Sequence, residues 1–124
     1  MPLTFHKMHA NGDDFVVIDS RNIANPVTGQ LARRLGDRHR GIGFNQLAVV
    51  LDCADADARV EFWNADGSAL DVCGSATRGV ADRLMREANQ TSITLRTNRG
   101  LLTCERTPGG LIAVDMGEPL FDWQ

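Results

Sequence analysis

Two side chains with chemical capability, Asn64 and Cys73, stand close together in the sequence. Asn64 ends a predicted strand, a tight Asp66-Gly67 turn reverses the chain, and a helix is predicted to open just after Cys73. A cysteine acts as a base only in its thiolate form, and a helix N-terminus favours that charged form. The sequence therefore predicts a reactive Cys73 at the start of a helix.

The backbone that follows Cys73 adds a possible binding function. At a helix N-terminus the N–H groups of Gly74, Ser75 and Ala76 lack helical partners, so they form a site for an anion such as a carboxylate. Gly74 has no Cβ, which lets a ligand approach the backbone closely. Asp71 is near enough in the sequence to oppose a thiolate. We expect a base and a carboxylate site within one helical turn.

Strands and two helices are predicted around this stretch. Two apolar rows at helical spacing predict a helix over 74–88, and a second helix, capped by Thr28, is predicted over 29–38. Alternating apolar and polar residues predict strands at 3–8, 15–19, 47–51, 59–64, 92–97, 101–106 and 111–116. The fold class is therefore α+β, with about seven mostly antiparallel strands and one helix apolar enough to lie inside a curved sheet.

The two predicted helices differ in their apolar surface. The 29–38 helix has one buried stripe, formed by Leu31 and Leu35, and its arginines together with a following one are expected to face solvent: Arg33, Arg34, Arg38 and Arg40. In the 74–88 helix two rows are expected to be buried: Ala76, Val80 and Leu84, and Ala81, Met85 and Ala88. A turn-rich loop at 9–14 joins the first two strands into a hairpin whose tip could reach a ligand.

Composition excludes several classes of protein. A chain of 124 residues with a formal net charge of −3 fits one domain and has no basic run for nucleic acid or a membrane surface. It has no apolar stretch near the ~20 residues of a membrane span, and its first residues do not read as a signal peptide. Three cysteines, Cys53, Cys73 and Cys104, argue against a disulfide framework and for the cytoplasm.

No metal or dinucleotide site is expected. The three histidines show no convincing ligand spacing, and we predict Cys53 to be incidental and Cys104 to be a core residue. The Gly41-Ile42-Gly43 sequence follows a helix and precedes a strand, the reverse of the dinucleotide-binding order. Gln46, at the start of that strand, is either a satisfied core amide or a ligand contact.

Two motifs resemble the active-site segment of the diaminopimelate epimerase family: Asn-Ala-Asp-Gly-Ser at 64–68 and Cys-Gly-Ser-Ala-Thr-Arg at 73–78. Other segments agree with the same family: Lys-Met-His at 7–9, Asp-Phe-Val-Val-Ile-Asp at 14–19, Arg-His at 38–39, Gly-Ile-Gly-Phe at 41–44 with Gln46, and Met-Gly-Glu-Pro at 116–119. The resemblance covers essentially the whole chain.

This resemblance implies a cofactor-free racemase fold of two similar domains, each a curved mixed sheet wrapped around a central helix. The family interconverts LL- and meso-diaminopimelate for lysine and cell-wall synthesis, and two cysteines act across the substrate Cα. Cys73 matches the first-domain cysteine. Gln46 and Asn64 match substrate-binding positions, and Gly74 and Ser75 fall where backbone N–H groups hold the α-carboxylate.

Three positions depart from the family pattern. Asp13 stands where an asparagine usually contacts substrate, and an ionised carboxylate can only accept hydrogen bonds. Ser75 replaces the asparagine that usually follows Cys-Gly, which leaves a backbone role intact. Gly79 replaces a second cysteine, which argues against a local disulfide.

By resemblance, residues 1–118 form the first domain, residues 119–124 begin an interdomain linker, and the second domain is absent. The isolated chain is then expected to be inactive, because one base cannot perform a two-base inversion. Alternatives are another amino-acid racemase or phenazine-type isomerase of the superfamily, against which Gln46 and Asn64 favour diaminopimelate. A non-catalytic binding domain that forms a homodimer is a further alternative.

Overall fold

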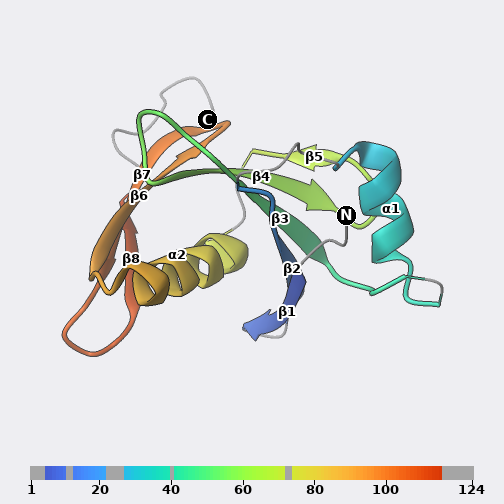
Figure 1. The fold of residues 1–124 in the computed structure, drawn as a ribbon. Coiled ribbons are helices and arrows are strands. Elements are labelled where there is room, and N and C mark those ends of the chain that lie inside the picture. The colour runs from blue at the N-terminus through green and yellow to red at the C-terminus, as the bar shows by residue number, and fades with distance from the viewer. Residues whose placement is uncertain (1–4, 11–12, 22–26, 40, 72–73, 116–124) are drawn as a thin grey trace, which may run out of the picture.

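The residues that the structure describes form one curved mixed sheet and two helices (Figure 1). The computed structural model describes residues 5–10, 13–21, 27–39, 41–71 and 74–115. The helices are α1 (Gly29–Gly36) and α2 (Gly74–Ala88). The strands are β1 (Phe5–Ala10), β2 (Asp13–Asp19), β3 (Gln46–Leu51), β4 (Ala58–Asn64), β5 (Ala69–Leu70), β6 (Ser92–Thr97), β7 (Gly100–Arg106) and β8 (Ile112–Asp115).

The strands follow the order β1-β2-β3-β4-β6-β7-β8, and β5 pairs with β4 beside this path. Two neighbouring pairs are parallel, β2 with β3 and β4 with β6, and the other pairings are antiparallel. The β4–β6 contact is short, with only Ala58 paired to Leu95 and Arg59 paired to Arg96. The predicted α+β class, with a curved and mostly antiparallel sheet, is confirmed.

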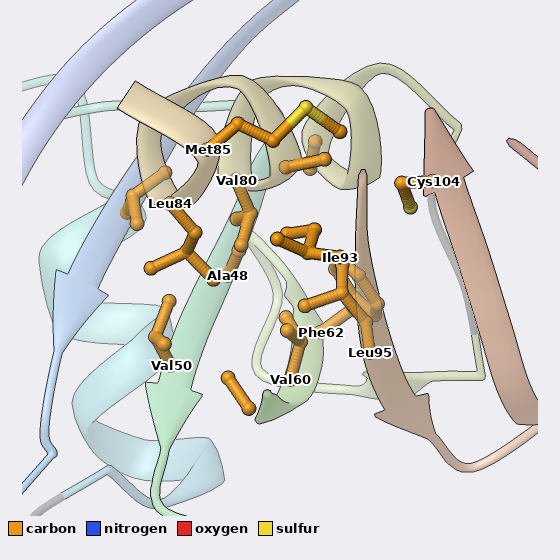
Figure 2. Packing of buried hydrophobic residues seen from close by; sticks show 14 of the residues in the cluster. Ala48, Val50, Val60, Phe62, Val80, Leu84, Met85, Ile93, Leu95 and Cys104 are labelled. Carbon is orange, nitrogen blue, oxygen red and sulfur yellow. The ribbon is translucent and has the colours of Figure 1, made fainter. Parts of the chain in front are cut away.

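Helix α2 lies inside the curve of the sheet, as predicted, and packs against β2, β3, β6, β7 and β8. Its buried side chains meet the apolar side chains of the surrounding strands (Figure 2). Figure 2 labels ten members of this cluster: Ala48, Val50, Val60, Phe62, Val80, Leu84, Met85, Ile93, Leu95 and Cys104. The predicted burial of Ala88 is wrong, because this last helical residue lies exposed beside a hollow lined by Leu84 and Glu87.

Helix α1 lies on the outer face of the sheet, over a second apolar cluster. The Thr28 hydroxyl caps it by accepting a hydrogen bond from Leu31 N at 3.2 Å, as predicted, but the helix ends at Gly36, two residues earlier than expected. The predicted stripe of Leu31 and Leu35 is only partly buried, and Ala32 and Gly36 are the buried residues. A Cβ on Gly36 would lie 2.9 Å from Ala65 Cα, so the close approach of α1 to the segment after β4 requires small residues.

Two other differences concern strands. Strand β1 continues to Ala10 and β2 begins at Asp13, so the predicted loop at 9–14 is largely strand. Strand β5 is not predicted, because two residues are too short to show a periodicity, and the described sheet therefore has eight strands rather than about seven.

Candidate functional site

Gln46 and Asn64 lie opposite each other at one end of the sheet, where β3 begins and β4 ends. Residues two and four positions along the same strands, Ala48 and Phe62 among them, pack against α2. Because side chains alternate along a strand, Gln46 and Asn64 face the same concave side as α2. Directly opposed residues of antiparallel strands have Cβ atoms about 4.5–5.5 Å apart, so both amides can contact one small ligand.

The N-terminal half of α2 points toward this end of the sheet. A Cβ on Gly79 would lie 2.6 Å from Cζ of Phe15, and Phe15 is paired with Gln46. At the other end of the helix, Glu87 accepts a hydrogen bond from Arg21, just beyond β2, at 2.9 Å. These two contacts fix the direction of α2, which starts at Gly74 on the side of the paired amides.

The close contact at Gly79 also gives a physical reason for one departure from the family pattern. Gly79 packs so closely on the Phe15 ring that any side chain would require the ring to move. A cysteine at this position would therefore displace Phe15, one of the core residues nearest to Gln46.

Part of the predicted site falls outside the described residues. Cys73 lies there, and for Asp13, Gly74 and Ser75 the structure describes the backbone alone. Asp13 begins β2 and pairs with Ala10, and Gly74 and Ser75 open α2. The roles of these four residues stay predictions.

A hydrogen-bonded turn holds Asn64. Its backbone N–H donates to Ser68 O at 2.8 Å, its carbonyl accepts from Gly67 N at 3.0 Å, and its side-chain Nδ2 donates to Ser68 Oγ at 3.0 Å. The Ser68 hydroxyl and backbone N–H in turn donate to Asp66 Oδ1 at 2.6 and 2.9 Å. These bonds to Ser68 hold the pKa of the Asp66 carboxyl below its ordinary value. The turn thus orients the Asn64 amide before a ligand arrives.

Helix α1 supports this turn from the outer face. Gly67 has φ +90°, and a Cβ there would lie 2.4 Å from Gly29 O. A Cβ on Gly29 would in turn lie 2.8 Å from Gly67 O. The first residue of α1 and the turn after Asn64 therefore touch through backbone atoms, an approach that only glycine allows without displacement.

A group of charged and polar residues holds the start of β3. Arg38 donates two hydrogen bonds to the Asp14 carboxylate, each at 3.0 Å, and a third to Asn45 Oδ1 at 2.9 Å. Lys7 Nζ lies 3.5 Å from Asp14 Oδ2. Arg38 is exposed, as predicted, but its guanidinium is also bonded to Asp14, whose side chain is 13% exposed.

Sequence reasoning missed Asp14 and Arg38 as a pair. They stand 24 positions apart, and no spacing rule joins residues across a helix and two loops. The Arg38 bonds, followed by the charges of Arg38 and Lys7, hold the pKa of the Asp14 carboxyl far below its ordinary value of 3.8. The carboxylate is therefore ionised at neutral pH.

The other two cysteines differ from the predicted chemistry of Cys73. Cys104 is buried on β7, as predicted, and burial raises the pKa of its thiol to about 11. Cys53 lies in the loop after β3, where its thiol donates to Asp55 Oδ1 at 3.0 Å. A protonated core thiol such as Cys104 does not act as a base at neutral pH.

The hollows of the described surface are lined by residues other than Gln46 and Asn64. A hollow of about 340 Å³, lined by residues such as Met85, Arg86 and Arg106, lies at the far end of α2. Within the described ranges no three His, Cys, Asp or Glu side chains gather closely enough to hold a metal ion. The helices that the structure describes include none long and apolar enough to cross a membrane.

The model of the diaminopimelate epimerase family matches residues 5–121 of this chain. A diaminopimelate epimerase from Rhizorhabdus wittichii is 46% identical over 99% of the chain, and one from Acidiphilium cryptum is 42% identical over 97%. In both cases the chain spans 43% of the relative's length.

Solved structures give a fold likeness at lower identity. A hydroxyproline epimerase from Agrobacterium vitis matches with a TM-score of 0.66 and 16% identity, over 90% of this chain and 40% of that one. A phenazine biosynthesis protein of the PhzF family from Bacillus anthracis matches with a TM-score of 0.63 and 21% identity, over 90% and 38%. These two likenesses support the fold.

Proposed function

The chain belongs to the diaminopimelate epimerase family, and on that premise we propose that it carries one half of a cofactor-independent active site that inverts the α-carbon of diaminopimelate. The observation that carries this proposal is the pairing of Gln46 with Asn64 at the sheet end toward which α2 begins. Each amide offers both donors and an acceptor, as binding of an amino acid's ammonium and carboxylate groups requires.

Cys73 is the proposed base of this half. Its thiolate takes the α-proton, so an S–H bond forms while the Cα–H bond breaks. The electron pair left at Cα delocalises onto the α-carboxylate, where backbone N–H groups at Gly74 and Ser75 stabilise the developing charge. The first turn of α2 has no acidic side chain to oppose an anion.

Inversion then needs an acid on the opposite face of Cα. A second cysteine thiol donates its proton there, which returns the electron pair to a C–H bond of opposite configuration. We propose that this thiol belongs to another part of the same protein rather than to a second copy. The curated relatives support this choice, because the chain spans only 43% of their length.

The proposal includes the domain bounds and the location. Residues 1–118 form the first domain and residues 119–124 begin the linker to the second. The reaction takes place in the cytoplasm, where reducing conditions keep both catalytic thiols free. The substrate is diaminopimelate rather than proline or histidine, a choice supported by the curated relatives and by the retention of Gln46 and Asn64.

The test uses the protein as its gene encodes it, assayed with LL-diaminopimelate in D₂O. We expect conversion to the meso form with deuterium incorporated at the inverted Cα. Cys73→Ala removes the base and should lower kcat/KM by about 100- to 10,000-fold. Cys53→Ala is the matched control, because Cys53 lies in the loop after β3, and it should retain wild-type turnover.

Two results would overturn the proposal. One is turnover of proline or histidine without turnover of diaminopimelate, which would assign the chain to another substrate. The other is wild-type activity in Cys73→Ala, which would remove Cys73 from the chemistry. A third experiment mixes the inactive Cys73→Ala protein with an inactive protein that lacks the second catalytic cysteine. Restored activity would instead favour two copies of the protein that share a site.

A further inference from the structure

We propose that Arg38 and Asp14 are positioning residues that set the place and orientation of Gln46, and this inference rests on the proposed substrate-binding role of Gln46. Neither residue belongs to the face that carries Gln46. Asp14 and Val16 are two positions apart on β2, and Val16 packs in the outer cluster beneath α1. Any effect of Asp14 on a substrate bound by Gln46 therefore passes through the backbone that connects Asp14 to Gln46.

The contact between Arg38 and Asp14 has a fixed geometry. Nη1 of Arg38 donates to Oδ2 of Asp14 and Nη2 donates to Oδ1, both at 3.0 Å. Such a two-bond pairing of guanidinium and carboxylate sets direction as well as distance. A lysine ammonium lacks this planar fork and acts as a point charge.

Asn45 connects this pair to β3. Its backbone N–H donates to the Asp14 carbonyl at 2.9 Å and to Asp14 Oδ1 at 3.0 Å, and its side-chain oxygen accepts from Arg38 Nη2 at 2.9 Å. The residue just before Gln46 is therefore bound to β2 and to the loop after α1 at once. This fixes the point where β3 enters the sheet.

The loop between Arg38 and Asn45 is held at its other side by the end of α1. The carbonyl of Leu35 accepts hydrogen bonds from Ile42 N at 2.8 Å and Gly43 N at 2.9 Å. Lys7 Nζ donates to Ile42 O at 3.4 Å. Gly43 has φ +78°, and a Cβ there would lie 3.0 Å from Arg38 Cγ, so the loop folds directly over the arginine. The loop after α1 is thus bound to the end of α1 and, through Arg38 and Asn45, to Asp14 of β2.

The consequence for Gln46 follows from strand geometry. A shift of β3 by one residue would turn Gln46 from the concave face to the outer face, because side chains alternate. Smaller shifts would misalign its amide with the amide of Asn64 across the β3–β4 pairing. The contacts of Asn45 with Asp14 and Arg38 oppose both movements at the residue adjacent to Gln46.

The test compares Arg38→Lys with Arg34→Lys in the protein as its gene encodes it. Arg34 is an exposed arginine of α1, so its replacement matches the chemistry without touching Asp14. For Arg38→Lys we expect KM for diaminopimelate to rise about 10-fold while kcat changes less than about 2-fold, the pattern of weakened substrate binding. Arg34→Lys should leave both constants at wild-type values.

A double-mutant cycle with Gln46→Ala separates positioning from general stability. If Arg38 acts through Gln46, Arg38→Lys should raise KM no further once Gln46 is alanine. Asp14→Asn, which keeps the size of the side chain, serves as a second variant in the same cycle should Arg38→Lys not fold.

Each outcome has a distinct meaning. Multiplicative effects of Arg38→Lys and Gln46→Ala, or an Arg38→Lys protein that behaves like Arg34→Lys, would overturn the positioning role. A wild-type protein without activity on diaminopimelate would instead overturn the proposed function. A wild-type protein that is active while Gln46→Ala keeps its KM would overturn the role of Gln46, and with it this inference.

Discussion

Two neighbouring amides at one end of the sheet are supported in different ways. Gln46 follows a segment bound by charged groups, in which Arg38 and Lys7 surround the carboxylate of Asp14. Asn64 sits on a turn held by hydrogen bonds within the turn and by the backbone contact of Gly67 with α1. The first support depends on charge and the second mainly on size, so different perturbations should weaken them separately.

The largest expected effect comes from the support of Asn64. In Gly67→Ala the new Cβ would meet Gly29 O at 2.4 Å, and the backbone at φ +90° would be strained for alanine. We expect the free energy of unfolding to fall by about 2–5 kcal/mol, as measured by urea denaturation. Under the proposed function, KM for diaminopimelate should also rise, because Asn64 loses its fixed turn.

Gly110→Ala is the matched control for this substitution. Gly110 has a similar φ of +85°, but an added Cβ would meet nothing within 4 Å. Its cost should be limited to the backbone strain of about 1–2 kcal/mol. Equal losses in the two variants would contradict a role for the contact between Gly67 and Gly29.

An intermediate effect is expected from Asp14→Asn, which tests the support of Gln46. The pKa of the Asp14 carboxyl is lowered in the folded protein, so its contribution is present above its ordinary pKa of 3.8 and is lost as the pH falls below that value. Near neutral pH the variant should be about 1–2 kcal/mol less stable than wild type. Urea denaturation between about pH 5 and pH 2 should show this difference shrinking.

Salt provides a second test of the same contrast. At about 1 M salt the screening length is about 3 Å, so the decrease in the free energy of unfolding caused by Asp14→Asn should become smaller. The loss caused by Gly67→Ala should persist, since it arises from overlap of atoms. A loss in Asp14→Asn that is independent of both pH and salt would contradict a charge-based support.

The smallest expected effect concerns the start of α1. Thr28→Ala removes the hydroxyl that accepts a hydrogen bond from Leu31 N and should cost about 0.5–1 kcal/mol in thermal or urea unfolding. Because Gly29 follows Thr28 and touches Gly67, the substitution also loosens the support of Asn64. Thr28→Ser, which keeps the hydroxyl, should be nearly neutral, and equal losses in the two variants would argue against the cap.

The sequence predicts best those elements whose burial is periodic. Helix α2 has the predicted bounds because two rows of apolar residues mark its buried surface, and β6 has them because Ile93 and Leu95 alternate with polar residues. The end of α2 was harder to predict, since Ala88 fits the row while the surface beside it is a hollow. The periodicity of apolar residues shows which face of a helix is apolar, but it does not show at which residue that face ceases to be packed against other elements.

Contacts between distant segments were less predictable. The hydrogen bonds of Arg38 with Asp14 join a loop to strand β2, and the approach of Gly29 to Gly67 joins the start of a helix to a turn. Neither contact depends on a local sequence pattern. A charged residue beside a helix, such as Arg38, is usually expected to be solvated. The pairing of Gln46 with Asn64 could be predicted in part from the sequence, because both residues stand at strand ends and match family binding positions.

The short junction between β4 and β6 has a consequence for the order in which the sheet opens. Among the described strands, only two ladder pairs join β4 to β6, Ala58 with Leu95 and Arg59 with Arg96, and hydrogen bonds between Asp57 and Thr94 lie beside them. Helix α2 packs on strands on both sides of this junction and so holds them together, and we expect the amide hydrogens at the junction to exchange with solvent before those of the longer β2–β3 pairing. The paired amides Gln46 and Asn64 lie at the opposite end of β4 from this junction, so the candidate site would outlast a local opening there.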